Sequence, residues 1–141
     1  MGQELSQEQE KIPTWLERIP RELQDSLQKE LSQFEAKVGF FDWGISIEMA
    51  YNNDTWVSIT PNSYIVERFA DRVINASMLR IDFDSYLSET IISIYYHDYI
   101  SRYYIIPSKM EIALKGGKIT VDILAYTRAT TITHENDNRI W

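Results

Sequence analysis

Acidic side chains are the first residues of this 141-residue chain whose spacing could support chemistry. Asp82 and Asp84 lie two positions apart on the polar side of an alternating apolar run. Two carboxylates on one side of a strand can contribute oxygen ligands to Mg²⁺ or Ca²⁺, but two are too few for a complete site. Solvated strand faces often show the same spacing. We therefore expect no metal to bind at Asp82 and Asp84.

The chain has two histidines, His97 and His134, which are its candidate imidazole ligands. A zinc centre needs at least three protein ligands, so these two require a carboxylate in addition. His97 precedes Asp98 at an expected turn and His134 lies in a polar tail, which favours exposed loop positions. The chain has no cysteine, no G-x-S-x-G elbow and no glycine-rich phosphate loop. We expect no metal and no cofactor, and the sequence favours a non-enzymatic role.

An aromatic stretch, IISIYYHDYISRYYIIPSK at 91–109, is the strongest indication of a binding surface. Tyrosine suits protein contacts because it offers a large area with few rotamers. The alternative is a central strand whose tyrosines pack across neighbouring strands and keep their hydroxyls in water. We assign to the candidate binding surface Tyr95, His97, Asp98, Tyr99, Arg102, Tyr103 and Tyr104.

The charge of the chain restricts the partners that this surface could take. The formal net charge is −7, and lysine and arginine are scattered along the sequence. Nucleic-acid binders usually carry a basic cluster, because phosphate contacts supply much of their affinity. We therefore expect no nucleic-acid partner. The partners that we expect are a basic protein, attracted by the acidic surface, or a second copy of the chain.

The cellular location of the protein is indicated by sequence features that are absent. No apolar run approaches the ~20 residues that a membrane span needs, so we expect no membrane association. Residues 1–6, MGQELS, fit a loose N-myristoylation pattern, but a supporting polybasic signal is missing. The absence of cysteine fits a reducing compartment. We expect a cytoplasmic protein.

Two stretches have the apolar spacing of amphipathic helices. The first, 20–38, draws one stripe with Leu23, Leu27, Leu31, Phe34 and Val38. The second, 64–76, repeats an apolar residue every four positions, at Ile65, Phe69 and Val73. We expect both helices to pack on one face of a sheet.

Alternating apolar residues predict the strands of that sheet. The expected strands are 43–50, 55–60, 79–84, 90–97, 102–106, 109–115 and 118–128. The sequence KGGK at 115–118 predicts a two-residue hairpin turn, which places Lys115 opposite Lys118, Ile112 opposite Val121 and Glu111 opposite Asp122. The acidic pair could hold a metal or share a proton, but in solvent we expect the two side chains to splay apart.

These elements predict one α+β domain spanning 1–141, with 1–11 disordered. We expect one twisted antiparallel sheet of about five to seven strands with two main helices, 20–38 and 64–76, on one face. The function that the sequence favours is a protein-interaction module: a small acidic adaptor, an inhibitor or immunity-type protein, or an assembly subunit. The alternative is a cone-shaped small-molecule-binding protein or enzyme whose pocket is lined by Tyr, His and Asp.

Overall fold

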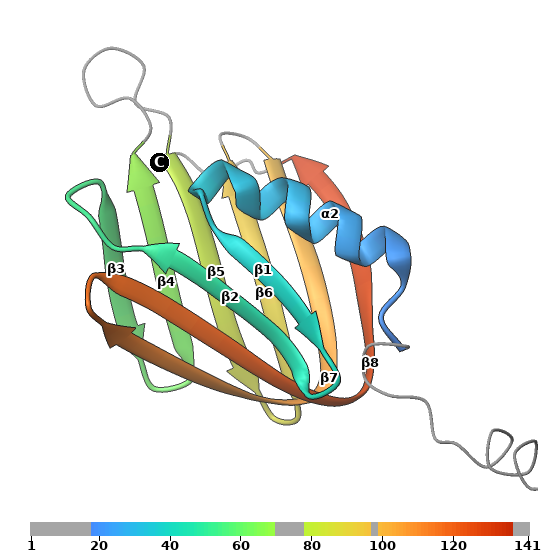
Figure 1. Ribbon diagram of the computed structural model, residues 1–141. Coiled ribbons are helices and arrows are strands. Elements are labelled where there is room, and N and C mark those ends of the chain that lie inside the picture. The colour runs from blue at the N-terminus through green and yellow to red at the C-terminus, as the bar shows by residue number, and fades with distance from the viewer. Residues whose placement is uncertain (1–17, 70–77, 97–98, 137–141) are drawn as a thin grey trace, which may run out of the picture.

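The computed structural model describes residues 18–69, 78–96 and 99–136 of the chain (Figure 1). The expected disorder of 1–11 lies outside these residues. The described part contains a helix, α2 (Arg21–Leu31), a 3₁₀ turn, η2 (Ser32–Phe34), and eight strands. The strands are β1 (Lys37–Phe41), β2 (Gly44–Ala50), β3 (Thr55–Thr60), β4 (Ser63–Phe69), β5 (Met78–Tyr86), β6 (Glu89–Tyr96), β7 (Tyr99–Lys115) and β8 (Lys118–Asn136).

All eight strands belong to one antiparallel sheet in the order β1-β2-β8-β7-β6-β5-β4-β3. The two longest strands, β7 and β8, take part in both layers of the bent sheet. The first half of β7 pairs with β6, whereas the first half of β8 pairs with β2. Figure 1 shows the result: β1, β2 and the β7–β8 hairpin cross in front of the remaining strands. The sheet therefore forms two layers with a core between them.

Irregularities in the β7–β8 ladder occur where the sheet changes direction. The register shifts between Arg102 and Tyr103 and again between Ile106 and Ser108. Pro107 lies in the second shift, which suits a residue that has no N–H to donate to a neighbouring strand. The Ser108 hydroxyl there donates a hydrogen bond to Thr90 of β6. Bulges bend a strand and increase its twist, so they explain how one sheet supplies both layers.

The core is closed by α2, which lies along one end of the two layers (Figure 1). Four residues of the predicted stripe, Leu23, Leu27, Leu31 and Phe34, are buried and join one hydrophobic cluster with both layers, which confirms that this side of the helix packs on the sheet. Val38, the fifth, is partly buried. The front layer contributes Ile45, Ile47, Ile119, Val121 and Ile123, and the layer behind contributes Val66, Ile81, Phe83, Ile92, Ile94 and Ile105.

The expected α+β fold with two main helices and a sheet of five to seven strands is wrong, because most of the described chain is strand and its sheet has eight strands. Helix 20–38 is too long: η2 ends at Phe34, and Glu35 adopts the left-handed conformation, with φ of 56°. Residues 37–41 then form β1, in which Val38 and Phe40 alternate toward the core. The spacing of apolar residues along the chain could not reveal that Val38 and Phe40 pair with residues of β2.

The expected helix 64–76 is also wrong in its described part, because Ser63–Phe69 form β4. Thr60 pairs with Ser63 across a two-residue turn at Pro61 and Asn62, so β3 and β4 make a hairpin. The spacing of Ile65 and Phe69 fits a helix, but the β-branched pair Ile65–Val66 fits a strand equally well. Pairing on both sides, with β3 and β5, decides between them.

The β7–β8 hairpin confirms the pairing expected from KGGK. Lys115 pairs with Lys118, Ile112 with Val121 and Glu111 with Asp122. Gly116 and Gly117 have φ of 62° and 76°, as a primed two-residue turn requires. The two carboxylates have separate partners: Asp122 accepts a hydrogen bond from the Ser46 hydroxyl at 2.7 Å, and Glu111 lies 3.8 Å from Lys109.

Candidate functional site

The residues assigned from sequence to a binding surface lie on β6 and β7, apart from His97 and Asp98, which lie outside the described residues. Tyr99, Arg102 and Tyr104 are half-buried. The structure places His134, which we expected in a polar tail, in β8, where its backbone pairs with Ser101. This part of the sheet therefore brings three of the seven assigned side chains to a partly exposed position.

Tyr95 and Tyr103 are both buried, on opposite faces of the sheet. Tyr103 is 0% exposed and belongs to the core, opposite Ile92 of β6. Tyr95 is 6% exposed and lies under the guanidinium of Arg80, 5.2 Å from its ring centre. Arg80 is itself paired with Asp82 through two contacts, at 2.8 Å and 3.1 Å. Neither tyrosine side chain is available to contact a partner.

Tyr103 provides a direct test of this placement. Its hydroxyl is buried and has no hydrogen-bond partner in the part of the chain that the structure describes. An unsatisfied buried hydroxyl costs about 1–3 kcal/mol. We therefore expect Tyr103→Phe to raise the free energy of unfolding by about 1 kcal/mol in urea denaturation. We expect Tyr103→Ser to lower it by about 3 kcal/mol or more, because it leaves a large cavity. Destabilisation by phenylalanine would show that the hydroxyl has a partner.

Exposed apolar side chains gather instead around β3 and the tip of the β7–β8 hairpin. Tyr51, Trp56, Ile59 and Leu114 are 48–58% exposed. Three of them, Tyr51, Ile59 and Leu114, line an open groove of about 310 Å³, which we call the edge groove. It is lined by Tyr51, Val57, Ile59, Leu114, Lys115, Gly116, Gly117 and Lys118. A second open groove of about 320 Å³ lies on the other side of Tyr51 and reaches Trp56.

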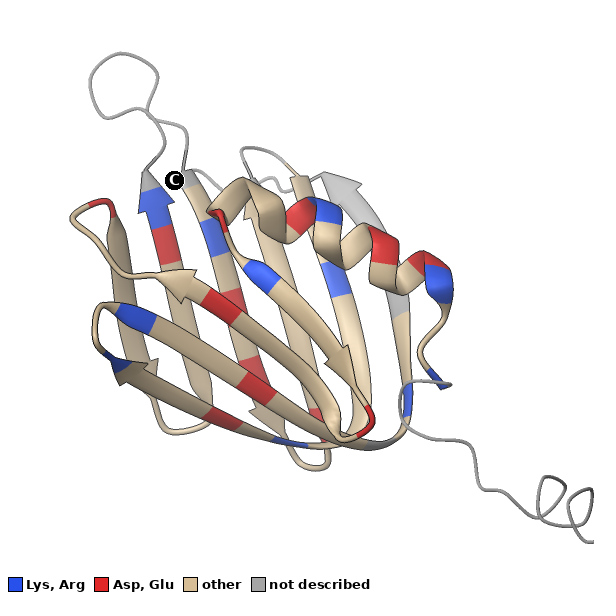
Figure 2. Cartoon of the chain, in the orientation of Figure 1, with Lys and Arg blue, Asp and Glu red and all other residues tan. Residues whose placement is uncertain are grey.

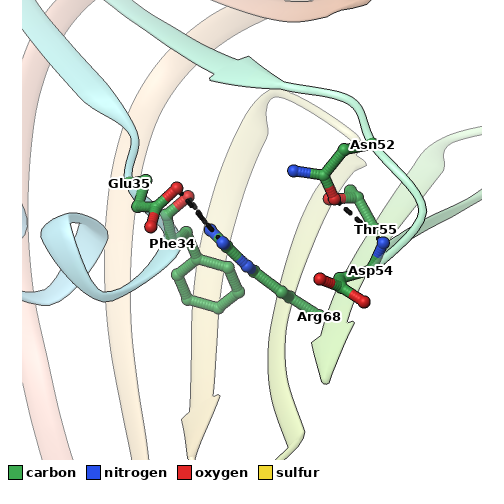
Figure 3. Close-up of polar contacts among 6 residues, drawn as sticks. All are labelled: Phe34, Glu35, Asn52, Asp54, Thr55 and Arg68. Carbon is green, nitrogen blue, oxygen red and sulfur yellow. Dashed lines mark hydrogen bonds and ion pairs between the residues drawn. The ribbon is translucent and has the colours of Figure 1, made fainter. Parts of the chain in front are cut away.

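Hydrogen bonds fix the walls of the edge groove. The Tyr51 N–H donates to the carbonyl of Gly117 at 2.7 Å, which ties the β2–β3 connection to the hairpin tip. The Asn52 side chain accepts from the Asp54 N–H at 2.9 Å and from the Thr55 hydroxyl at 3.2 Å (Figure 3). Asn and Asp favour such local turns, as the cluster at 52–54 suggests. The β2–β3 connection is thus held in place at both ends.

The layer behind is joined to the helix by Arg68 of β4. Its guanidinium donates to the Phe34 carbonyl at 3.0 Å and lies 3.1 Å from the Glu35 carboxylate (Figure 3). Arg68 pairs with Thr55, the first residue of β3, and Thr55 is buried. The strand that forms one wall of the edge groove is therefore connected through Arg68 to the segment that follows α2.

β3 is an edge strand. It pairs with β4 on one side, and no described strand pairs with its other side. Natural edge strands usually carry charges, prolines or bulges that prevent another chain from pairing with them. The sequence of β3, TWVSIT, has no charge and no proline, and its ladder with β4 has no bulge. Its open side is therefore suited to pairing with a further strand.

Positive charge lies beside this edge. Figure 2 shows the lysines of the β7–β8 hairpin tip in blue. Lys115 and Lys118 line the edge groove, and no carboxylate does. The Lys118 Nζ lies 3.4 Å from Glu48 Oε1, whereas Lys115 has no ion pair among the residues described. The groove therefore presents one uncompensated ammonium group to solvent.

Two further features of the described residues concern metal sites and membrane-spanning helices. No group of three or more His, Cys, Asp or Glu side chains in them could hold a metal ion. Within the same ranges, no helix has the length and apolar character needed to cross a membrane. The features that the described residues do present are exposed apolar side chains, an open strand edge and two lysines beside it.

Comparisons with known proteins give no further guide to function. No protein family, curated protein or solved structure shows a significant match to the chain. The inferences about function therefore depend on the side chains and geometry described above.

Proposed function

We propose that the chain is a non-enzymatic protein-interaction module whose contact surface is the edge groove and the open side of β3. The observation that carries this proposal is the uncharged edge strand β3, whose exposed Ile59 lines the edge groove together with exposed Leu114. Apolar and aromatic side chains grouped around a groove supply most of the binding energy in many protein interfaces. An open strand edge adds main-chain hydrogen bonds to a bound segment.

An open groove favours a protein segment over a small molecule. Sites for small molecules usually enclose most of the ligand surface and contain a few polar groups that fix its orientation. The edge groove is open, and its charged lining residues are two exposed lysines. Where a cone-shaped fold would enclose a pocket, the space between the layers holds a cluster of buried apolar side chains. These features support the interaction module.

The biological forms of such a module remain those suggested by the sequence. An adaptor, an inhibitor or immunity-type protein and an assembly subunit all need one surface that binds a protein. Tyr99, Arg102 and Tyr104 offer a secondary, half-buried contact region on β7. We further propose that the protein works in the cytoplasm, because a chain without cysteine fits a reducing compartment.

Peptide selection tests the proposal. The full chain is immobilised and used to select peptides from a random display library, and their dissociation constants are measured by calorimetry. We expect the double variant Ile59→Ser/Leu114→Ser to bind these peptides about 30-fold more weakly or worse, because about 2 kcal/mol of apolar contact is lost. Both side chains are about half exposed, so the fold should survive the change.

The matched control is Tyr86→Ser/Leu87→Ser, which removes two exposed apolar side chains from the β5–β6 turn, away from the lining of the edge groove. We expect this control to bind as the wild type does. Failure to select any peptide above background would contradict the proposal. Equal losses in the two double variants would do so as well.

A further inference from the structure

We propose that the edge groove binds an extended, acidic segment of another protein, which adds to β3 as a further strand. This inference rests on the proposed function and specifies the chemistry of the partner. It combines two independent features: the open, uncharged edge of β3 and the lysines at the rim of the groove.

The alternation of side chains along β3 determines which side chains of a bound segment would face the edge groove. Val57 and Ile59 line the edge groove, whereas Trp56 points to the opposite face of the strand. An added strand would place every second side chain against Val57, Ile59 and Leu114. The intervening side chains would lie on the face of Trp56. The partner segment therefore needs apolar residues at alternate positions facing the groove.

The length of β3 limits the segment to a few residues. Six residues at about 3.3 Å each span roughly 20 Å, so five to seven residues of a partner can pair with β3. Main-chain hydrogen bonds would form at alternate residues of the added strand, because successive N–H groups of a strand point in opposite directions. A helical segment would use none of these edge groups.

The rim of the groove favours a carboxylate on the partner. Lys115 has no ion-pair partner in the described chain, and Lys118 has one partly buried partner, Glu48. The net charge of the whole chain is −7, which by itself repels an acidic partner. At physiological ionic strength, charges more than about 8 Å apart are strongly screened. The lysines at the rim therefore decide the local preference.

A second copy of this chain fits the groove less well. In a twofold dimer the same patch meets itself, so the lysines at one rim would face those of the other copy. A different protein with an acidic, extended segment avoids this contact between lysines.

Charge reversal at the rim tests the preference for acid. Peptides selected on the wild-type chain should be enriched in Asp and Glu, and Lys115→Glu should weaken their binding by about tenfold or more. The matched control is Lys109→Glu, which reverses an exposed lysine on the same strand that does not line the groove. We expect the control to change affinity less than about threefold at 0.15 M salt.

N-methylation tests strand addition. Each backbone amide of one selected peptide is methylated in turn, and affinity is measured by calorimetry. We expect losses at every second position, because only alternate N–H groups of the added strand face β3. A pattern with no alternation would overturn strand addition.

The outcomes separate this inference from the proposed function. Neutral or basic peptides that still depend on Ile59 and Leu114 would overturn the acidic preference and leave the interaction module standing. Loss of dependence on Ile59 and Leu114 would contradict the module itself. Dimerisation of the chain in light scattering, lost in Ile59→Ser, would overturn the inference by showing that a second copy occupies the edge.

Discussion

Gly44→Ala is expected to lower the free energy of unfolding by about 3 kcal/mol or more, which is a large effect for adding a single methyl group. Gly44 begins β2 with φ of 148°, a conformation that side chains disfavour. A Cβ at this position would lie 1.9 Å from the carbonyl oxygen of Ile123 on β8. The clash is with backbone, so relief requires β2 and β8 to separate.

The control for this variant is Gly39→Ala on β1. A Cβ there would lie 2.6 Å from the ring of Phe41, and that exposed side chain can rotate away. We expect Gly39→Ala to cost far less than Gly44→Ala in urea denaturation. Similar costs at the two positions would contradict the close pairing of β2 with β8, and with it the front layer of the fold.

Leu27→Asp is expected to abolish cooperative folding. Leu27 is 0% exposed and belongs to the cluster that joins α2 to both layers. A carboxylate placed there is buried without a charge partner, which costs several kcal/mol in addition to the lost packing. Circular dichroism during heating measures the effect. The control is Gln28→Asp on the exposed side of the helix, which should melt as the wild type does. A cooperative, near wild-type melt of Leu27→Asp would contradict the position of α2.

The elements that could be predicted from sequence are those with strong local patterns. The leucine stripe identified the buried face of α2, because four apolar residues at helical spacing leave few alternatives. The KGGK turn set the whole register of the β7–β8 hairpin, since a two-residue loop fixes which residues face each other. Both features depend on residues that are close in the chain.

The elements that could not be predicted depend on pairing between distant residues. The apolar residues of 64–69 have a spacing compatible with a helix, yet these residues form a strand that pairs with β3 on one side and β5 on the other. The expected strands 102–106 and 109–115 are one strand, β7, which continues through a bulge at Pro107. A proline in the sequence shows where a strand can bend, but it does not show whether pairing with the neighbouring strand resumes beyond the bend.

The candidate site shows the same division. Tyr95 and Tyr103 lie on strands that are partly apolar on both faces. Alternation alone could not show that Tyr103 is packed in the core and that Tyr95 lies beneath Arg80. The edge groove joins Tyr51 and Ile59 to Leu114, which only the folded sheet brings together. One signal was present in the sequence: the strand TWVSIT has no charge, although an exposed edge usually carries one.

The most direct test of the proposed contact surface is a nuclear magnetic resonance spectrum of the full chain bound to a selected peptide. We predict intermolecular contacts between backbone protons of the peptide and those of Val57 and Ile59, in the pattern of paired strands. We also predict side-chain contacts to Tyr51 and Leu114. Contacts confined to Tyr99, Arg102 and Tyr104, with β3 unchanged, would show that the protein binds its partners elsewhere.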